Sequence, residues 1–580
     1  MRPRMAVAAL GAVAVVAALG ACSKNTGEST TGGQQAKKQS GGIGTAADSK
    51  GPAAPVKGAK KGGTINLIQE DDFEHLDPAR VYVNNSQVFA RLFQRQLTAF
   101  VDDPKTGKST LVGDLATDPG KDVSTGQKCT KWRFTLKSGL KYEDGSPITA
   151  KDVAYNVARS FSPDLADGPH YIQQWLADSI NYNAKYKGPY NGASATPPGV
   201  HVSGNTITFD FKHPHCDMPY AASWGTTAPV PKAKDTKTKY DLHPFSSGPY
   251  KIDTYQKDNK IVLSRNKYWD PKTDPLRHNY PDKFQVEIGP NAIDQTNRVI
   301  ASNGSDAYAI PQARGGVAPT MVDKVRNDPS LKGQIRSGYT QFVWYLAINN
   351  MRIKDVNVRK ALNYGMDKNA FIRVIGGPSF GEPATTLMSP TTTGFAKYDA
   401  YPHDVAKAKQ MLKGKNLKLV FAYSNTAEGQ KQATVIQDSL QKLGVKIVLK
   451  PIDPASYYTE IGRRDNQYDL YLAGWGSDWP SGSTIIPPVF DGRTIQPQGN
   501  NDYSYYNDDA INKQIDKANL MPADKAGPEW AKIDKSIMTK DAPVVPLYYQ
   551  KEYTLLGKKV GGVDLGLSSG WPEYTSAYAK

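Results

Sequence analysis

A strand, a helix and a second strand follow one another within residues 418–449, and this pattern limits the folds that the chain can adopt. Residues 418–423 have the apolar character of a strand. Gly444 can end the helix that follows, and one stripe of that helix carries Ala433, Ile436, Leu440 and Leu443. Residues 445–449 form the second strand. Because two strands joined by one short helix form a parallel βαβ unit, we expect a fold of the α/β class.

A loop rich in glycine and tryptophan follows the next expected strand, at residues 468–472, where apolar and polar side chains alternate. Glycine lets a backbone approach a ligand closely, and indole rings offer rigid apolar walls with a polar edge. A carboxylate among them can meet a cation where little water is present. We interpret the loop as a ligand-binding element, the alternative being a turn packed on the core; its residues are Gly474, Trp475, Gly476, Asp478 and Trp479.

The length of 580 residues exceeds what a single hydrophobic core supports, so we expect two or three domains. The net charge is +16, but residues 1–61 hold nine basic and two acidic side chains, and the remaining excess is spread along the chain. No nucleic-acid-binding motif accompanies this charge. We therefore expect a soluble body with a basic surface, and no nucleic acid among its partners.

The N-terminus has the pattern of a bacterial lipoprotein signal. A basic start precedes an apolar run that is too short to span a bilayer comfortably. The run ends in Leu-Gly-Ala-Cys, which resembles the lipobox where signal peptidase cuts before the cysteine that receives a lipid. We expect residues 1–21 to be the signal peptide, with an ordinary secretory signal as the alternative. Cys22 is then the lipidated residue on the outer face of the cell membrane, and the small, polar residues 22–61 form a flexible tether.

Two further cysteines, Cys129 and Cys216, remain once Cys22 is set aside. Export to an oxidising compartment favours a disulfide between them. A disulfide that closes the loop between Cys129 and Cys216 stabilises a fold by roughly 4–5 kcal/mol in the chain-entropy model. The alternative is two separate buried thiols.

Five sequence blocks, in the same order, resemble the peptide-binding receptors of bacterial ABC importers, the extracellular solute-binding protein family 5. One of them contains the Thr149-to-Asp152 capping box that starts a helix. The resemblance extends from about Gly62 to the end of the chain. The blocks are residues 132–161, 247–270, 346–372, 383–412 and 474–482.

The resemblance implies a two-lobed, periplasmic-binding-protein-like (type II) α/β fold with an extra subdomain in the first lobe. The subdomain is expected at residues 111–239 and the second lobe at residues 311–534. The first lobe then comprises residues 62–110, 240–310 and 535–580. Because the chain crosses between the lobes at least twice, this arrangement allows hinge closure over a ligand.

The resemblance also implies roles for individual residues of the loop. In that family an aspartate of the matching loop pairs with the α-ammonium group of the ligand, and Asp478 stands at this place. Trp475 and Trp479 would form walls of the pocket, and Gly474 and Gly476 would offer backbone contacts. Further candidates for the lining, with buried scaffold as the alternative for each, are Trp224, Trp344, Tyr345 and Asn349.

The sequence departs from the family pattern directly after the aspartate. Many relatives continue into a second Asp-Pro pair, whereas residues 479–482 read Trp-Pro-Ser-Gly here. This difference leaves the class of ligand open. Arg463, Arg464 and Arg493 are near in sequence, but none of them can be assigned to a ligand carboxylate.

The function that the resemblance implies is a lipid-anchored receptor that captures di- or oligopeptides by hinge closure. Its expected partners are the permease and ATPase subunits of an ABC importer, and it is expected to act as a monomer without metal, cofactor or catalytic residues. Alternatives are another solute, such as an oligosaccharide or a nickel complex, and a secreted hydrolase. Two G-x-S-x-G matches, at residues 377–381 and 566–570, carry little weight because the first follows a helix instead of a strand.

Overall fold

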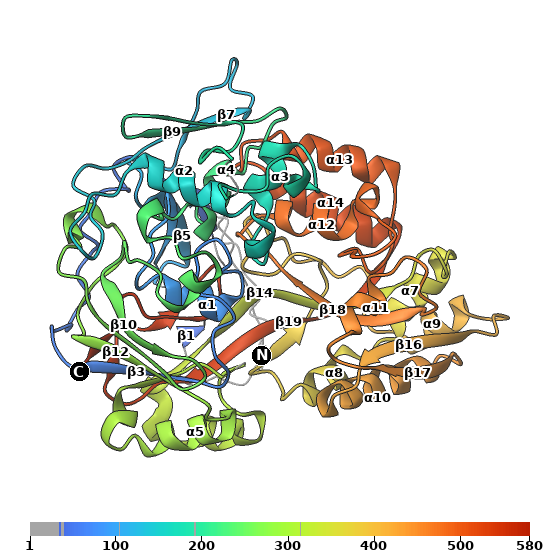
Figure 1. Ribbon diagram of the computed structural model, residues 1–580. Helices are drawn as coiled ribbons and strands as arrows, with labels where there is room; N and C mark the ends of the chain where they lie inside the picture. Colours follow the sequence, from blue (N-terminus) through green and yellow to red (C-terminus); the bar gives the residue numbers. More distant parts are fainter. Residues whose placement is uncertain (1–33, 36–39, 104, 191–192, 314) are drawn as a thin grey trace, which may run out of the picture.

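Two lobes make up the body of the chain, with two long strands running between them (Figure 1). The expected signal peptide and Cys22 lie outside the residues that the structure describes. No helix of the described residues is long and apolar enough to cross a membrane. The computed structural model describes residues 34–35, 40–103, 105–190, 193–313 and 315–580.

The second lobe contains the predicted βαβ unit. Strand β16 (Lys418–Ser424) leads into helix α10 (Ala427–Gln441), and β17 (Lys446–Ile452) lies parallel to β16. Strand β18 (Leu470–Gly476) lies on the other side of β16, also parallel to it. Ala433, Ile436 and Leu440 are fully buried under the sheet, as their spacing predicts. The α/β class is therefore confirmed.

Two long strands complete this sheet. Strand β14 (Ile335–Ile348) pairs antiparallel with β18 on one side and with β19 (Val544–Leu555) on the other, and β15 (Gly381–Pro383) forms the edge. Besides α10, the helices of this lobe are α7 (Val356–Gly365), α8 (Lys368–Val374), α9 (Val405–Met411), α11 (Tyr457–Ile461), α12 (Ile486–Phe490), α13 (Asp509–Asn519) and α14 (Gly527–Lys540).

The same two strands connect the lobes. Ile335, Tyr553 and Leu555 at their far ends pack in one cluster with first-lobe residues such as Ile68 and Val299. The pairing of β14 with β19 shifts register between residues 339 and 343, midway along the strands. These two strands therefore cross between the lobes, and their pairing is irregular midway between the two ends.

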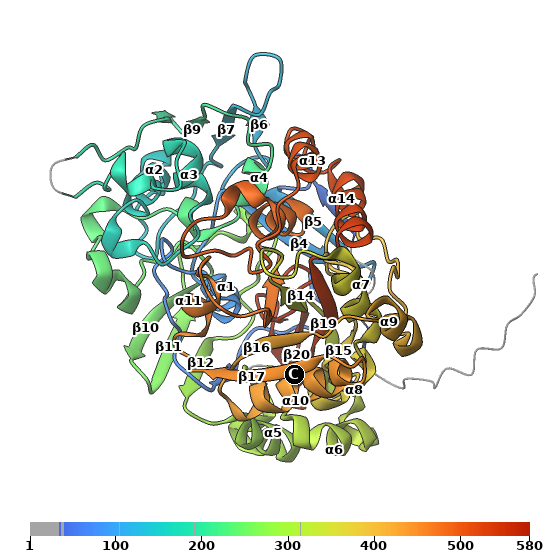
Figure 2. The same ribbon diagram turned by 90° about the vertical axis from the view of Figure 1, so that its right-hand side faces the viewer.

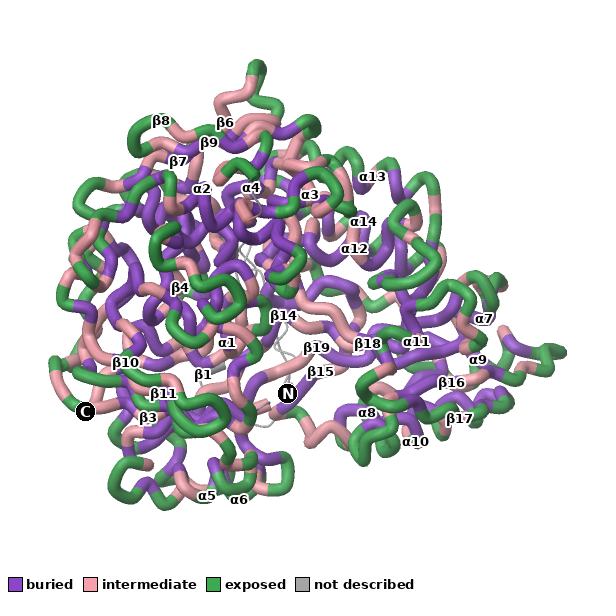
Figure 3. Tube along the Cα trace, in the orientation of Figure 1, coloured by how far each residue is buried: buried purple, intermediate pink, exposed green. Residues whose placement is uncertain are grey.

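The first lobe is built on a five-stranded sheet. Strand β3 (Thr64–Gln69) lies parallel to both β12 (Lys283–Ile288) and β13 (Ala309–Pro311), so its carboxyl end shares one edge with theirs. Strands β10 (Tyr250–Gln256) and β11 (Lys260–Arg265) extend the sheet beyond β12. Buried residues line the centre of both lobes, while the exposed ones lie on the outer loops and helices (Figure 3).

The inserted subdomain holds a smaller sheet and carries the disulfide. Its strands are ordered β6 (Lys121–Asp122), β7 (Lys131–Thr135), β9 (Thr206–Asp210) and β8 (Val200–Ser203). The predicted capping box at Thr149 and Asp152 is present and begins α2 (Ala150–Arg159), which is followed by α3 (Tyr171–Ala177) and α4 (Met218–Ala221). Cys129 and Cys216 are joined by a disulfide.

Two of the expected domain borders lie in the wrong place. Helices α5 (Ala292–Ala301) and α6 (Val322–Asn327) lie side by side (Figure 2), and residues 317–331 share a cluster with the first lobe. The second lobe therefore begins near residue 335, not 311. It also extends through α14 and into β19, past the expected border at 535. The sequence did not predict this extension, because a buried strand does not reveal which sheet it joins.

After β19 the chain returns to the first lobe. Val560, Val563, Tyr574 and Ala577 are buried in the same cluster as Ile65 of β3. Short antiparallel pairs hold this segment: β20 (Val560–Gly561) with β23 (Tyr578–Ala579), and β21 (Asp564–Leu565) with β22 (Pro572–Glu573).

The expected flexible tether is wrong for residues 40–61, which pack on the first lobe. Strand β2 (Ser40–Ile43) lies parallel to β5 (Lys108–Gly113), which pairs with β4 (Thr98–Asp103). Further on, the Ser49 hydroxyl accepts a hydrogen bond from the backbone N–H of Gly113 at 2.8 Å. An edge strand is held by main-chain hydrogen bonds, so a segment without large apolar residues can still be ordered.

Candidate ligand-binding site

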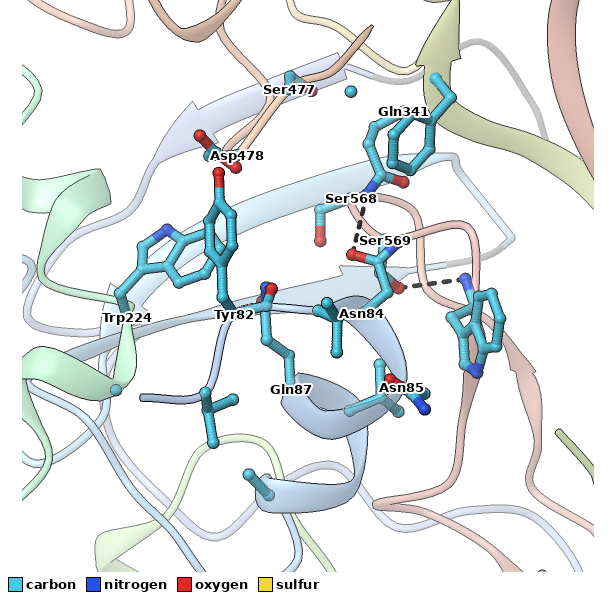
Figure 4. Close-up of a pocket in the computed structure, with 18 of the residues that line it drawn as sticks. Tyr82, Asn84, Asn85, Gln87, Trp224, Gln341, Ser477, Asp478, Ser568 and Ser569 are labelled. Atoms are coloured by element: carbon cyan, nitrogen blue, oxygen red, sulfur yellow. Dashed lines mark hydrogen bonds between the residues drawn. The ribbon is translucent and has the colours of Figure 1, made fainter. Parts of the chain in front are cut away.

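A cavity of about 920 Å³ lies between the lobes, and segments of both form its wall. The first lobe contributes the ends of β3 and β13, the start of α1 (Asn84–Ala90) and Trp224 of the inserted subdomain. The second lobe contributes the middle of β14 and the end of β18. A space of this size is typical of small-molecule sites. Figure 4 shows part of the lining.

Thr484 fixes the loop that follows β18. The Thr484 hydroxyl accepts a hydrogen bond from the backbone N–H of Asp478 at 3.2 Å. The Thr484 carbonyl oxygen accepts a hydrogen bond from the indole N–H of Trp475 at 2.6 Å. These contacts hold the Asp478 carboxyl at the top of the cavity, with the hydroxyl of Tyr82 directed at it (Figure 4).

The Asp478 carboxyl group accepts hydrogen bonds from two tyrosines of different parts of the chain. Tyr171 of the inserted subdomain donates its hydroxyl to Asp478 Oδ2, and Tyr82 of the first lobe donates a second hydrogen bond. Burial raises the pKa of Asp478 from 3.8 to about 6, although both hydroxyls act to lower it. No positively charged side chain of the described residues compensates this carboxyl group.

The two loop glycines make room for residues of β14. A Cβ atom on Gly474 would lie 2.7 Å from the Trp344 ring, and one on Gly476 would lie 2.8 Å from the Gln341 side chain. Both glycines also line the cavity. Their main effect in the structure is therefore to let side chains of β14 pack over β18. The close approach of a ligand to the backbone, which the sequence suggested, is a second use of the same glycines.

Six of the predicted site residues are brought together around the cavity. Trp344 is held there by a hydrogen bond from its indole N–H to Gln550 Oε1 at 2.7 Å and by stacking on Tyr548. Trp224 lies beside Tyr82, with ring centroids 5.4 Å apart. The predicted residues that line the cavity are Asp478, Trp475, Gly474, Gly476, Trp344 and Trp224.

Three predicted residues do not line the cavity, so their assignment is corrected. Tyr345 is only 3% exposed and packs in the core of the second lobe. Asn349 is also buried, and its amide donates a hydrogen bond to the Tyr471 hydroxyl at 2.7 Å. Trp479 is buried against the inserted subdomain, 4.6 Å from the Tyr171 ring. Alternation along β14 places Tyr345 on the face opposite to Trp344.

Trp479 instead joins the second lobe to the inserted subdomain. Its indole N–H donates a hydrogen bond to Asp217 Oδ2 at 3.1 Å, and the Ser483 hydroxyl donates to the same oxygen. Burial raises the pKa of Asp217, while both donors lower it. The loop after β18 thus contacts the inserted subdomain at two carboxyl groups: its own Asp478, which meets Tyr171, and Asp217 of the subdomain.

Several lining residues were missed from the sequence. The Gln341 amide of β14 donates a hydrogen bond to Asn84 Oδ1 at 3.0 Å, which links the lobes across the cavity (Figure 4). Arg91 lines the cavity as well, whereas Arg463, Arg464 and Arg493 do not. A run of polar residues at the start of α1, residues 84–87, was the available signal for this part of the wall. For Tyr171 the sequence offers none, because it lies 307 residues from Asp478.

Comparison with known proteins extends these observations. Residues 110–496 match the family model described as "Bacterial extracellular solute-binding proteins, family 5 Middle". The chain is 25% identical over 513 residues to the probable D,D-dipeptide-binding periplasmic protein DdpA of Escherichia coli (strain K12), covering 85% of this chain and 89% of that protein. It is 22% identical over 507 residues to the glutathione-binding protein GsiB of Salmonella paratyphi A, covering 85% and 90%.

A solved structure is also similar over nearly the whole length. The structure titled clavulanic acid biosynthesis oligopeptide binding protein 2 has a TM-score of 0.82 and 27% sequence identity, and the match covers 95% of this chain and 99% of that one. The two-lobed type II fold implied by the sequence is therefore confirmed.

Proposed function

The chain belongs to the bacterial extracellular solute-binding proteins, family 5, and on this basis we propose that it captures short peptides between its lobes and delivers them to an ABC importer. The observation that carries the peptide cargo is Asp478. This carboxyl group faces an inter-lobe cavity and has no cationic partner among the described residues. The α-ammonium group of a peptide supplies the missing charge.

Binding of the ammonium group changes the protonation of Asp478. In the free protein its pKa lies at about 6, because burial disfavours the charged form. A ligand cation next to the carboxylate lowers that pKa and keeps Asp478 ionised at neutral pH. The main-chain amides of the peptide then meet polar groups of the wall, such as Asn84, Gln341 and Gln550.

Closure follows from the two strands that cross between the lobes. In the structure the second-lobe loop already meets Tyr82 and Tyr171 at Asp478, and a bend at residues 339–343 of β14 would part them to admit a ligand. Each of these tyrosines belongs to the other side of the cavity from Asp478. We therefore infer that the ligand stabilises a closed form in which all three side chains meet around its amino terminus.

The sequence of residues 1–22 supports an anchor on the outer face of the cell membrane. We infer that Cys22 carries the lipid and that the protein acts as a monomer beside the permease and ATPase subunits. Labelling with radioactive palmitate is expected in the wild type and not in Cys22→Ser. Label retained by Cys22→Ser would contradict the anchor and leave the peptide cargo untouched.

Incubation of the purified protein with a defined peptide mixture tests the receptor function. After removal of unbound material, mass spectrometry is expected to recover intact peptides at about one per protein molecule. Peptide fragments would indicate a hydrolase and overturn the proposal. Recovery of a saccharide or a metal complex, with no peptide, would keep the transport role and refute the cargo.

A further inference from the structure

Charge is distributed unevenly over the cavity wall. Among the lining side chains that the structure describes, the carboxylates are Glu70, Asp71 and Asp478, and the single cation is Arg91. Glu70 and Asp71 directly follow β3, whose carboxyl end reaches the cavity. Glu70 is half-buried and Asp71 is exposed, and neither side chain has an ion-pair partner in the described part of the chain. Both remain available to a ligand.

Arg91 is already committed to groups of the protein. Its Nη1 atom lies 2.9 Å from Glu573 Oε2, and its Nη2 atom donates a hydrogen bond to the carbonyl oxygen of Phe100 at 3.1 Å. The same guanidinium acts to lower the pKa of the buried Asp102. Its charge is therefore already paired with Glu573, and a ligand carboxylate would have to compete with that ion pair.

The dimensions of the cavity let every wall charge act on the ligand. A compact space of 920 Å³ is about 10 Å across, which is close to the distance over which salt at 0.1 M screens charges. A cleft walled by one sign of charge also concentrates its field. At a protein-like effective dielectric, each unit charge at that distance changes affinity by roughly threefold to tenfold.

We propose that the cavity selects peptides of net positive charge, binding their amino terminus and a basic side chain, and that it does not recognise their carboxylate. This inference rests on the proposed peptide cargo and adds its chemical class. Asp478 holds the α-ammonium group, Glu70 and Asp71 attract the basic side chain, and the C-terminal carboxylate stays away from the acidic wall.

Calorimetry with four tripeptides tests the charge preference in the full-length protein. The probes are Ala-Lys-Ala, Ala-Leu-Ala and Ala-Glu-Ala with free termini, and Ala-Lys-Ala with an amidated C-terminus. We expect the lysine peptide to bind at least about tenfold more tightly than the glutamate peptide, with the leucine peptide between them. Amidation is expected to leave affinity unchanged or to improve it.

Substitutions at the wall distinguish this preference from a general surface effect. The double variant Glu70→Gln, Asp71→Asn is expected to reduce the lysine-to-glutamate affinity ratio by about tenfold. Glu74→Gln is the matched control, because Glu74 is exposed in the same segment and does not line the cavity. The ratio is expected to persist in that control and to shrink as salt is raised.

Two results would overturn the charge preference while leaving the peptide cargo intact. One is a glutamate peptide that binds as tightly as the lysine peptide, and the other is a loss of more than tenfold on amidation. Failure of all four peptides to bind would instead refute the peptide cargo on which this inference rests.

Discussion

Replacing Asp478 with asparagine removes one negative charge from the cavity and keeps the size of the side chain. In the free protein, burial raises the pKa of this carboxyl group from 3.8 to about 6, which corresponds to a cost of about 3 kcal/mol for its charged form. A ligand ammonium group offsets that cost. Loss of one member of such an enclosed pair typically costs about 3–5 kcal/mol, so we expect affinity for a free peptide amino terminus to fall by about 10²–10³-fold.

The pH dependence of binding follows from the same pKa. The ligand requires the ionised carboxylate, so below about pH 6 it must displace a proton from Asp478. Wild-type affinity is therefore expected to be about tenfold weaker at pH 5 than at pH 7. In Asp478→Asn no proton is displaced, and affinity is expected to be constant over this range.

Titration calorimetry with a tripeptide at both pH values measures these effects. Asp438→Asn is the matched control, because Asp438 is exposed on the outer face of α10 and does not line the cavity. It is expected to bind as the wild type does. Unchanged affinity in Asp478→Asn, or the same pH dependence in both proteins, would refute the role assigned to this carboxyl group.

Three further predictions follow from other groups. Tyr171→Phe removes a hydroxyl that lowers the pKa of Asp478, so the midpoint of the binding-against-pH curve is expected to rise by about one pH unit; an unmoved midpoint would contradict the contact. Cys129→Ser breaks the link to Cys216 and is expected to lower the free energy of unfolding by about 2–5 kcal/mol in a denaturant titration; equal stability would argue for separate thiols. Burial raises the pKa of Glu552 from 4.5 to about 8, so this group stabilises the fold below pH 4.5 relative to higher pH, and that contribution is lost as the pH rises to 8. Glu552→Gln is therefore expected to be more stable than the wild type at pH 8 by a few kcal/mol, and a lower melting temperature there would contradict this sign.

Local patterns predicted the parts of the fold that local interactions determine. The strand–helix–strand unit at residues 418–449 could be recognised because its helical stripe and its strands each bury one face. Asp478 could be singled out as a candidate from its place between glycines and indoles together with the resemblance of its loop to that of family 5, and its role is a proposal. The order of the sheet, with β19 between β14 and β15, depends on pairings between distant segments and could not be read from the residues.

The rest of the site could not be predicted, for two physical reasons. Tyr82 and Tyr171 reach Asp478 only after the first lobe and the inserted subdomain pack against the second lobe. Trp475 and Trp479 have the same chemistry, but Thr484 sets the path of the loop so that one indole lines the cavity and the other is buried beside Asp217. Which side of a loop a residue faces depends on such tertiary contacts.

The central claim is that Asp478 holds the amino terminus of a peptide inside the cavity. A double-mutant cycle tests it most directly: Kd values are measured at pH 7 for Ala-Lys-Ala and its N-acetylated form, each with the wild type and with Asp478→Asn. Acetylation is expected to weaken binding to the wild type by about 10²-fold or more and to have little further effect on the variant. Equal losses on acetylation in both proteins would show that the amino terminus binds elsewhere and would contradict the account.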